Sequence, residues 1–299
     1  MGPHPLETTE HTGQNTVPVR GAGDPLMHLL VPLLTTLLPV LYALSCVGYA
    51  HTYAREGGSG DRLGPLALRA AVLVHIAYLT VRGILEGHLP LASVYDFLSA
   101  TGLSMAIVYL YVEMREGVRT TGVFVLPFIL LIQILSSAYG GRTPPDPVPL
   151  RPYWFELHTL TAVLGYSAFA VSAIYGLLFL CLYRDIKANR FSHFFRRMPP
   201  LETLGQMNVR AAGGGLLLFT LAIILGVGWI QRSGTGSLTD PKIWLTLAVW
   251  CVFAFSLLSY HRFGWRGPRA IYVSLVGFTT LLLSRVAVDL FFHSFHSFR

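Results

Sequence analysis

The chain contains eight apolar stretches, each long enough to cross the hydrocarbon core of a bilayer as a helix. They lie at roughly residues 26–50, 64–85, 91–112, 121–139, 157–183, 211–230, 243–260 and 270–293. A composition of 53% hydrophobic and 12% charged residues, with a mean hydropathy of +0.55, is typical of an integral membrane protein. Runs of this length suit helices better than the short alternating strands of a barrel. We therefore expect an all-α, polytopic membrane helix bundle with about eight transmembrane helices, forming one domain over residues 25–299.

The basic residues are divided unevenly between the two sets of connections, and this asymmetry predicts the orientation because Lys and Arg resist translocation. Fourteen follow the first, third, fifth and seventh stretches: Arg55, Arg62, Arg69, Arg115, Arg119, Arg184, Lys187, Arg190, Arg196, Arg197, Arg210, Arg262, Arg266 and Arg269. Seven lie on the other side: Arg20, Arg82, Arg142, Arg151, Arg232, Lys242 and Arg299. Both termini are therefore expected outside the cytoplasm, with the bundle in the cytoplasmic (inner) membrane. Residues 1–24 have no basic start and no cleavage site, so we expect a disordered extracytoplasmic tail there.

Several function classes are disfavoured by the motifs that the sequence does not contain. Cys46, Cys181 and Cys251 occur singly, with no CxxC and no CxxCH, so neither a disulfide framework nor covalent haem attachment is expected. The sequence has no P-loop, GxSxG or HExxH motif, and we expect no catalytic residues. The basic residues beside spans are a topology signal, so nucleic acid is not an expected partner, whereas membrane lipid is.

One polar stretch, "TDPKIW" at residues 239–244, interrupts two apolar runs. It has the pattern of a helix start, because Thr239 or Asp240 can cap and Pro241 suits the first helical position. Lys242 and Trp244 suit the membrane interface. Two interpretations remain open: a helix start and nothing more, or a helix start that also supports a ligand site.

Histidines and aromatic residues gather on the side predicted to be external. The segment "RPYWFELHTL" brings Tyr153, Trp154 and His158 there, and the end of the last stretch, "FFHSFHSFR", brings His293 and His296. Neutral imidazoles from two helices can hold an iron while tryptophans cover a flat macrocycle. A polar tip at the headgroup level is the alternative interpretation of each histidine.

The ionisable residues inside predicted spans include His75, Arg285 and Asp289. Such groups are costly in the membrane and usually face the bundle interior. His75 is near the middle of the second stretch, where it either bonds to a neighbouring helix or ligates an internal haem. Arg285 and Asp289 stand four residues apart in the last stretch. They are expected to pair with each other, or alternatively Arg285 neutralises a haem propionate.

Motifs over residues 64–298 resemble those of the CcsA, CcmC and HemX group of haem-handling membrane proteins. The segment "HIAYLTVRGILEGHLPLASVYDFL" is similar to a family pattern that is matched here by His75, Arg82, Gly87, Pro90, Tyr95 and Asp96. It is followed in family order by "ELHTLTAVLGY", "LETLG", "LTDPKIW", "GWRGPRA" and "VDLFFHSFHSF". The central tryptophans of the family's external loop are replaced, and the intramembrane histidine before "GWRG" falls at Leu258, so the likeness is closest to HemX-like members.

The resemblance implies a non-covalent haem b site at the outer face, with His158 and His296 as the axial iron ligands. It further implies that residues retained from the external motif serve this site: Trp229, Asp240, Lys242 and Trp244. Trp154 would add apolar cover, and Lys242 or Arg232 would meet the propionates. His75 is an additional candidate for haem binding. The implied partners are haem and a membrane protein of cytochrome c assembly or an enzyme of tetrapyrrole synthesis. A regulator of tetrapyrrole biosynthesis and a small-molecule transporter that does not use haem remain the alternatives.

Overall fold

The structure, a computed structural model, describes residues 25–55, 62–91, 93–140, 153–233 and 240–291, with side chains between 29 and 284. The predicted tail at residues 1–24 and His296 lie outside the described residues. The described chain forms helices α1 (Pro25–Ala54), α2 (Leu63–Glu86), α3 (Val94–Glu116), α4 (Gly122–Tyr139), α5 (Tyr153–Lys187), α6 (His193–Arg197), α7 (Leu201–Ser233), α8 (Pro241–His261) and α9 (Pro268–Phe291).

The eight long helices correspond one to one with the eight predicted spans, and the all-α prediction is confirmed. Seven of them, α1 to α5, α7 and α8, are long and apolar enough to cross a membrane, and the described side chains of α9 add a shorter apolar stretch at Pro268–Ser284. Many large apolar side chains face outward, among them Leu73 at 68%, Leu217 at 76% and Ile224 at 62% exposure. An apolar exterior of this kind is what a lipid environment requires, since lipid stabilises exposed leucine as well as a protein core does.

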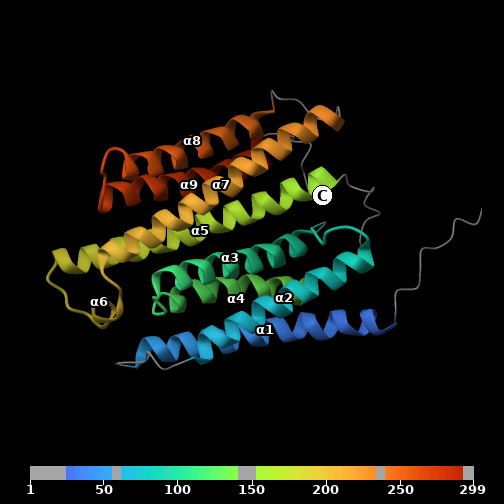
Figure 1. The fold of residues 1–299 in the computed structure, drawn as a ribbon, viewed down its shortest axis with the longest axis horizontal. Helices are drawn as coiled ribbons and strands as arrows, with labels where there is room; N and C mark the ends of the chain where they lie inside the picture. Colours follow the sequence, from blue (N-terminus) through green and yellow to red (C-terminus); the bar gives the residue numbers. More distant parts are fainter. Residues whose placement is uncertain (1–24, 56–61, 92, 141–152, 234–239, 292–299) are drawn as a thin grey trace, which may run out of the picture.

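The helices run alternately in opposite directions and pack side by side, with α1 at one edge of the bundle and the α8 and α9 pair at the other (Figure 1). Between these edges, α3 packs against α4 and α5, and α5 against α7 and α9. The ends of α2, α4, α7 and α9 therefore lie at the same end of the bundle as the starts of α3, α5 and α8. This end is the one that the charge asymmetry predicts to be external.

Helices α5 and α7 make the most extensive helix pair, and they extend beyond the apolar stretches predicted for them. At 35 and 33 residues, each is about 50 Å long, well above the roughly 30 Å of a hydrocarbon core. Their close approach depends on small residues. A Cβ on Gly215 would lie 2.8 Å from the Phe169 ring, and one on Gly165 would lie 3.2 Å from the Phe219 backbone nitrogen.

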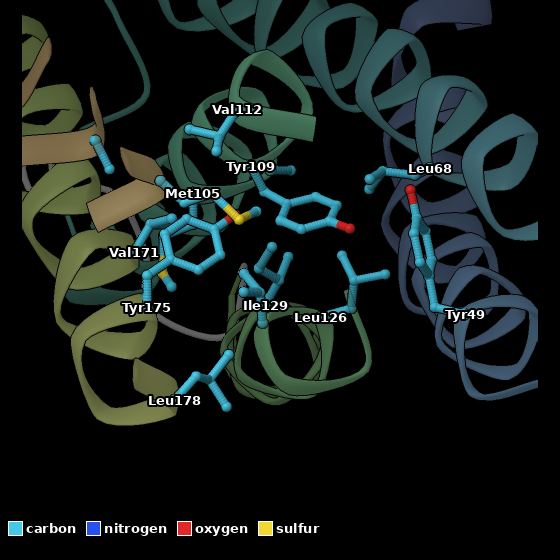
Figure 2. Close-up of a cluster of buried hydrophobic side chains, with 14 of the residues drawn as sticks. Tyr49, Leu68, Met105, Tyr109, Val112, Leu126, Ile129, Val171, Tyr175 and Leu178 are labelled. Atoms are coloured by element: carbon cyan, nitrogen blue, oxygen red, sulfur yellow. The ribbon is translucent and has the colours of Figure 1, made fainter. Parts of the chain in front are cut away.

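The core of the bundle combines apolar packing with buried hydrogen bonds. Figure 2 shows Tyr109 of α3 directing its hydroxyl toward Tyr49 of α1, and the two ring centroids are 5.7 Å apart. Leu126 of α4 and Tyr175 of α5 belong to the same cluster. Tyr49 also donates a hydrogen bond to the buried carboxylate of Glu113. Bonds of this kind between spans hold helices that have no hydrophobic driving force toward each other in lipid.

A second buried polar group joins three helices. The Asn208 amide of α7 donates to the Ser172 carbonyl of α5 at 2.8 Å and to the Ser274 hydroxyl of α9 at 3.2 Å. All three side chains are 2% exposed or less, so the bonds are made in the interior. The last helices are thereby anchored to the α5 and α7 pair.

The connection between α5 and α7 contains the short helix α6. Ser192 caps it by accepting from the Phe195 N–H at 3.2 Å. Arg197 donates to the Arg55 carbonyl at 2.5 Å and to the Ala54 carbonyl at 2.8 Å. The segment therefore lies across the end of α1 and satisfies carbonyls that a helix terminus leaves open.

Candidate functional site

His158 is held against the neighbouring helix by one ring nitrogen. It lies five residues after the start of α5, about 8 Å along the helix, and its Nδ1 donates to the Ala222 carbonyl of α7 at 2.8 Å. Its Nε2 has no hydrogen-bond partner among the described residues. A histidine whose Nδ1–H is bonded to a backbone carbonyl has a fixed tautomer and orientation, with Nε2 presented as the acceptor. This is the arrangement of a metal-ligating imidazole.

A glycine makes room for this imidazole. A Cβ built on Gly226 would lie 2.9 Å from both Cε1 and Nδ1 of His158, closer than real Cβ contacts. Gly226 follows Ala222 by four residues, so both lie on the same face of α7. Neither residue was singled out from the sequence, because only the packing of α5 on α7 gives them a role.

Aromatic and cationic side chains surround the same end of α5 and α7. Phe155 lies between His158 and Trp229, with ring centroids 6.5 Å and 5.1 Å away respectively. The Arg232 guanidinium lies over the Trp154 ring at 5.4 Å. Trp229 is partly buried and Trp154 is 44% exposed, so this group extends from the bundle to its surface.

The start of α8 confirms the interpretation of "TDPKIW" as a helix start. Asp240 is the N-cap and accepts from the Lys242 N–H at 2.8 Å, and Pro241 occupies the first helical turn. Thr239, the alternative cap, lies outside the described residues. Lys242 lies in the first turn of α8. Trp244 is 64% exposed and is not packed into the bundle. The structure therefore brings His158, Trp229, Asp240 and Lys242 to one end, with Trp244 on its outer surface.

His75 lies apart from this group, among α1, α2 and α3. It is fully buried, and both ring nitrogens are engaged: Nδ1 with the Tyr42 hydroxyl at 3.0 Å and Nε2 with the Ser99 hydroxyl at 2.8 Å. This is the arrangement of the helix-bonded alternative. Iron ligation by His75 would require one of these hydrogen bonds to break.

The motif residues of α2 and α3 form an ion-pair network at the predicted external end. Arg82 pairs with Glu86 on its own helix and with Asp96, which caps α3 together with Ser93. Glu156, two residues before His158, accepts from the Leu89 N–H at 3.2 Å. The first turn of α5 is thereby attached to the connection between α2 and α3. No sequence pattern predicts the Glu156 contact, because its partner is a backbone group.

The second predicted iron ligand, His296, lies outside the described residues, as does His293, and the side chains of Arg285 and Asp289 are not described. Within the described part of the chain, no three His, Cys, Asp or Glu side chains gather as they would around a bare metal ion. Haem needs only one or two axial ligands from the protein, because its porphyrin supplies the other four. A single tethered imidazole with aromatic and cationic neighbours therefore fits haem better than it fits a free ion.

These features define a polytopic helical membrane protein that presents a tethered histidine at one end of its bundle. The family described as "Cytochrome C assembly protein" matches residues 91–296, and the chain belongs to this family. It is 26% identical over 240 residues to the "Cytochrome c biogenesis protein CcsA" of Guillardia theta, covering 74% of this chain and 80% of that protein. It is 24% identical over 253 residues to "Protein HemX" of Brevibacillus brevis, covering 82% and 90%. The CcsA of Trieres chinensis is 23% identical over 291 residues, covering 87% and 93%.

Proposed function

We propose that this protein handles haem in the cytoplasmic membrane and binds haem b non-covalently at the end of the bundle where α5, α7 and α8 meet. The observation that carries the proposal is the His158 imidazole, with Nδ1 bonded to Ala222 and Nε2 available. Membership of the cytochrome c assembly family supports haem as the ligand. The absence of a CxxCH motif supports a non-covalent site.

His296 is proposed as the second axial ligand. Helix α9 ends at Phe291, at the same end of the bundle at which α5 starts. His296 is five residues further along the chain, a separation that can span at most about 18 Å. Chain length therefore permits His296 to reach the end of the bundle at which His158 lies, and the two histidines would hold the haem iron there, as the family motifs imply.

The neighbouring residues have distinct proposed tasks. The Ala222 carbonyl fixes the tautomer of His158 and raises the basicity of its free nitrogen. Trp229 and Phe155 exclude water from one side of the imidazole. We assign the two propionates to Lys242, in the first turn of α8, and Arg232, in the last turn of α7. Asp240 supports the site indirectly, because its cap fixes the start of the helix that carries Lys242.

The relatives are named for cytochrome c biogenesis, and we propose that this protein acts there as a haem chaperone rather than as an enzyme. Its partner would be another membrane protein of cytochrome c assembly. The test is the visible spectrum of the protein purified from cells supplemented with haem. We expect a haem absorption band that falls in both His158→Ala and His296→Ala. A colourless wild-type protein after supplementation would favour a transporter that does not use haem.

A second candidate, control of tetrapyrrole synthesis through an enzyme partner, is favoured by the external loop that lacks the central tryptophans and by the likeness to HemX. Deleting the gene that encodes this protein distinguishes the two candidate functions. Loss of covalent haem from c-type cytochromes at normal tetrapyrrole levels supports a role in cytochrome assembly. Altered levels of tetrapyrrole precursors with intact c-type cytochromes would support the regulatory role instead.

A further inference from the structure

Helices α8 and α9 form the edge of the bundle opposite α1 (Figure 1). An apolar groove lies on the outer surface between these two helices. Its volume is about 450 Å3, and it is lined by Cys251, Val252, Phe255, Tyr272, Val273 and Val276. Phe255, Tyr272 and Val276 are 44%, 51% and 57% exposed. The groove is therefore a depression in the lipid-facing surface rather than an internal cavity.

The turn that joins the two helices is strongly basic. Arg262, Arg266 and Arg269 are all exposed, and the sequence contains no Asp or Glu from residue 241 to residue 288. Gly264 and Gly267 have φ values of 64° and 75°, which allow the chain to reverse sharply. The three arginines thus occupy one short turn, and the nearest acidic residue in the sequence on either side is Asp240 or Asp289, about 20 residues away.

Helical register places two of these arginines above the groove. Arg262 caps the end of α8 and follows Phe255 by seven residues, and Arg269 precedes Val276 by seven residues in α9. Seven residues are close to two helical turns, so each arginine continues the face of its helix that lines the groove. The apolar lining begins about 10 Å along the helix from Arg262 and continues to Cys251 at about 16 Å.

We propose that this surface is a binding site for one anionic phospholipid, with its phosphate between Arg262 and Arg269 and an acyl chain in the groove. Guanidinium groups bind phosphate bidentately, and the lining accepts a hydrocarbon chain. Arg266, whose guanidinium lies 6.0 Å from the Tyr260 ring centroid, adds a third positive charge to the same turn. The charge asymmetry predicts that this turn is cytoplasmic, and the cytoplasmic leaflet is the one that is rich in anionic lipids. The site does not depend on haem.

The test is native mass spectrometry of the full-length protein, released from micelles containing phosphatidylglycerol or phosphatidylcholine with identical acyl chains. We expect one tightly retained phosphatidylglycerol and no equivalent phosphatidylcholine. Arg262→Gln with Arg269→Gln should weaken retention roughly 30-fold, since each arginine near an anionic surface contributes about 5-fold. The matched control, Arg184→Gln with Arg190→Gln, removes two exposed charges from the α5 end and should leave retention unchanged.

The groove itself is tested by Val276→Trp, which fills it while keeping all three arginines. Leu217→Trp, at another exposed position on α7, is the control. We expect the first substitution to abolish retention and the second to preserve it, with unfolding temperatures near wild type for both. Equal retention of the two lipids, retention unaffected by Val276→Trp, or displacement by millimolar inorganic phosphate would overturn the proposal.

Discussion

Gly226→Ala is the substitution that most specifically disturbs the position of the His158 imidazole against α7. The new Cβ would lie 2.9 Å from the imidazole Cε1 and Nδ1, so one of the two groups must move. The side chain of His158 can rotate, whereas α7 is fixed by its packing on α5. We therefore expect the ring to swing away from α7 and its hydrogen bond to the Ala222 carbonyl to break.

The free energy of unfolding should change little, because two effects oppose each other. Replacing a glycine in a helix by alanine stabilises the helix by about 1 kcal/mol. Loss of one hydrogen bond costs about 1 kcal/mol. Haem affinity should respond much more, because loss of a partner that orients a ligating histidine typically weakens metal binding by roughly 10- to 100-fold. The variant should therefore be a folded protein that binds haem poorly.

The assay is a haem titration of the purified protein, followed by absorbance, beside a thermal unfolding curve. Gly228→Ala is the matched control, because it adds a Cβ in the same helix two residues away, where nothing lies within 4 Å. It should bind haem like the wild type. If Gly226→Ala and Gly228→Ala bind haem equally well, the contact between His158 and α7 does not position a ligand.

Three further results are expected. Asp240→Ala should lower the free energy of unfolding by about 1 kcal/mol through loss of the α8 cap, and a larger loss confined to haem occupancy would show that the carboxylate serves the ligand directly. His75→Ala should destabilise the protein by about 3 kcal/mol, because it leaves the buried Tyr42 and Ser99 hydroxyls without this partner. It should leave the haem spectrum unchanged, and loss of the spectrum in a folded variant would make His75 a ligand. Single cysteines placed at Arg196 and at Asp240 should be labelled from opposite sides of the membrane, and labelling from one side would contradict the orientation.

The spans were predictable because hydropathy alone determines which segments can lie in lipid. The cap of α8 was predictable as well, because Asp240 and Pro241 act on their own helix through local backbone geometry. The full lengths of α5 and α7 were not predictable, because their polar ends continue the helices beyond the apolar stretches. Hydropathy therefore locates the apolar middle of each helix and misses the polar helical ends that extend beyond it.

The candidate site was predictable only in its polar and aromatic residues. His158 and Trp229 were singled out by residue type and motif, whereas Gly226 and Ala222 matter through packing against a helix 64 residues away in sequence. The hydrogen bonds of His75 also depend on two other helices, so the sequence left its two interpretations open. Contacts between helices, unlike caps, leave no local pattern from which they can be inferred.

The central claim is that the free nitrogen of His158 ligates haem iron at the end of the bundle where α5, α7 and α8 meet. It is tested most directly by the absorption and electron paramagnetic resonance spectra of His158→Gly, recorded with and without added imidazole. The account predicts that this variant loses the low-spin spectrum of an iron held by two imidazoles. It also predicts that free imidazole restores the spectrum by occupying the space that the side chain leaves. A low-spin spectrum identical to that of the wild type, without added imidazole, would contradict it.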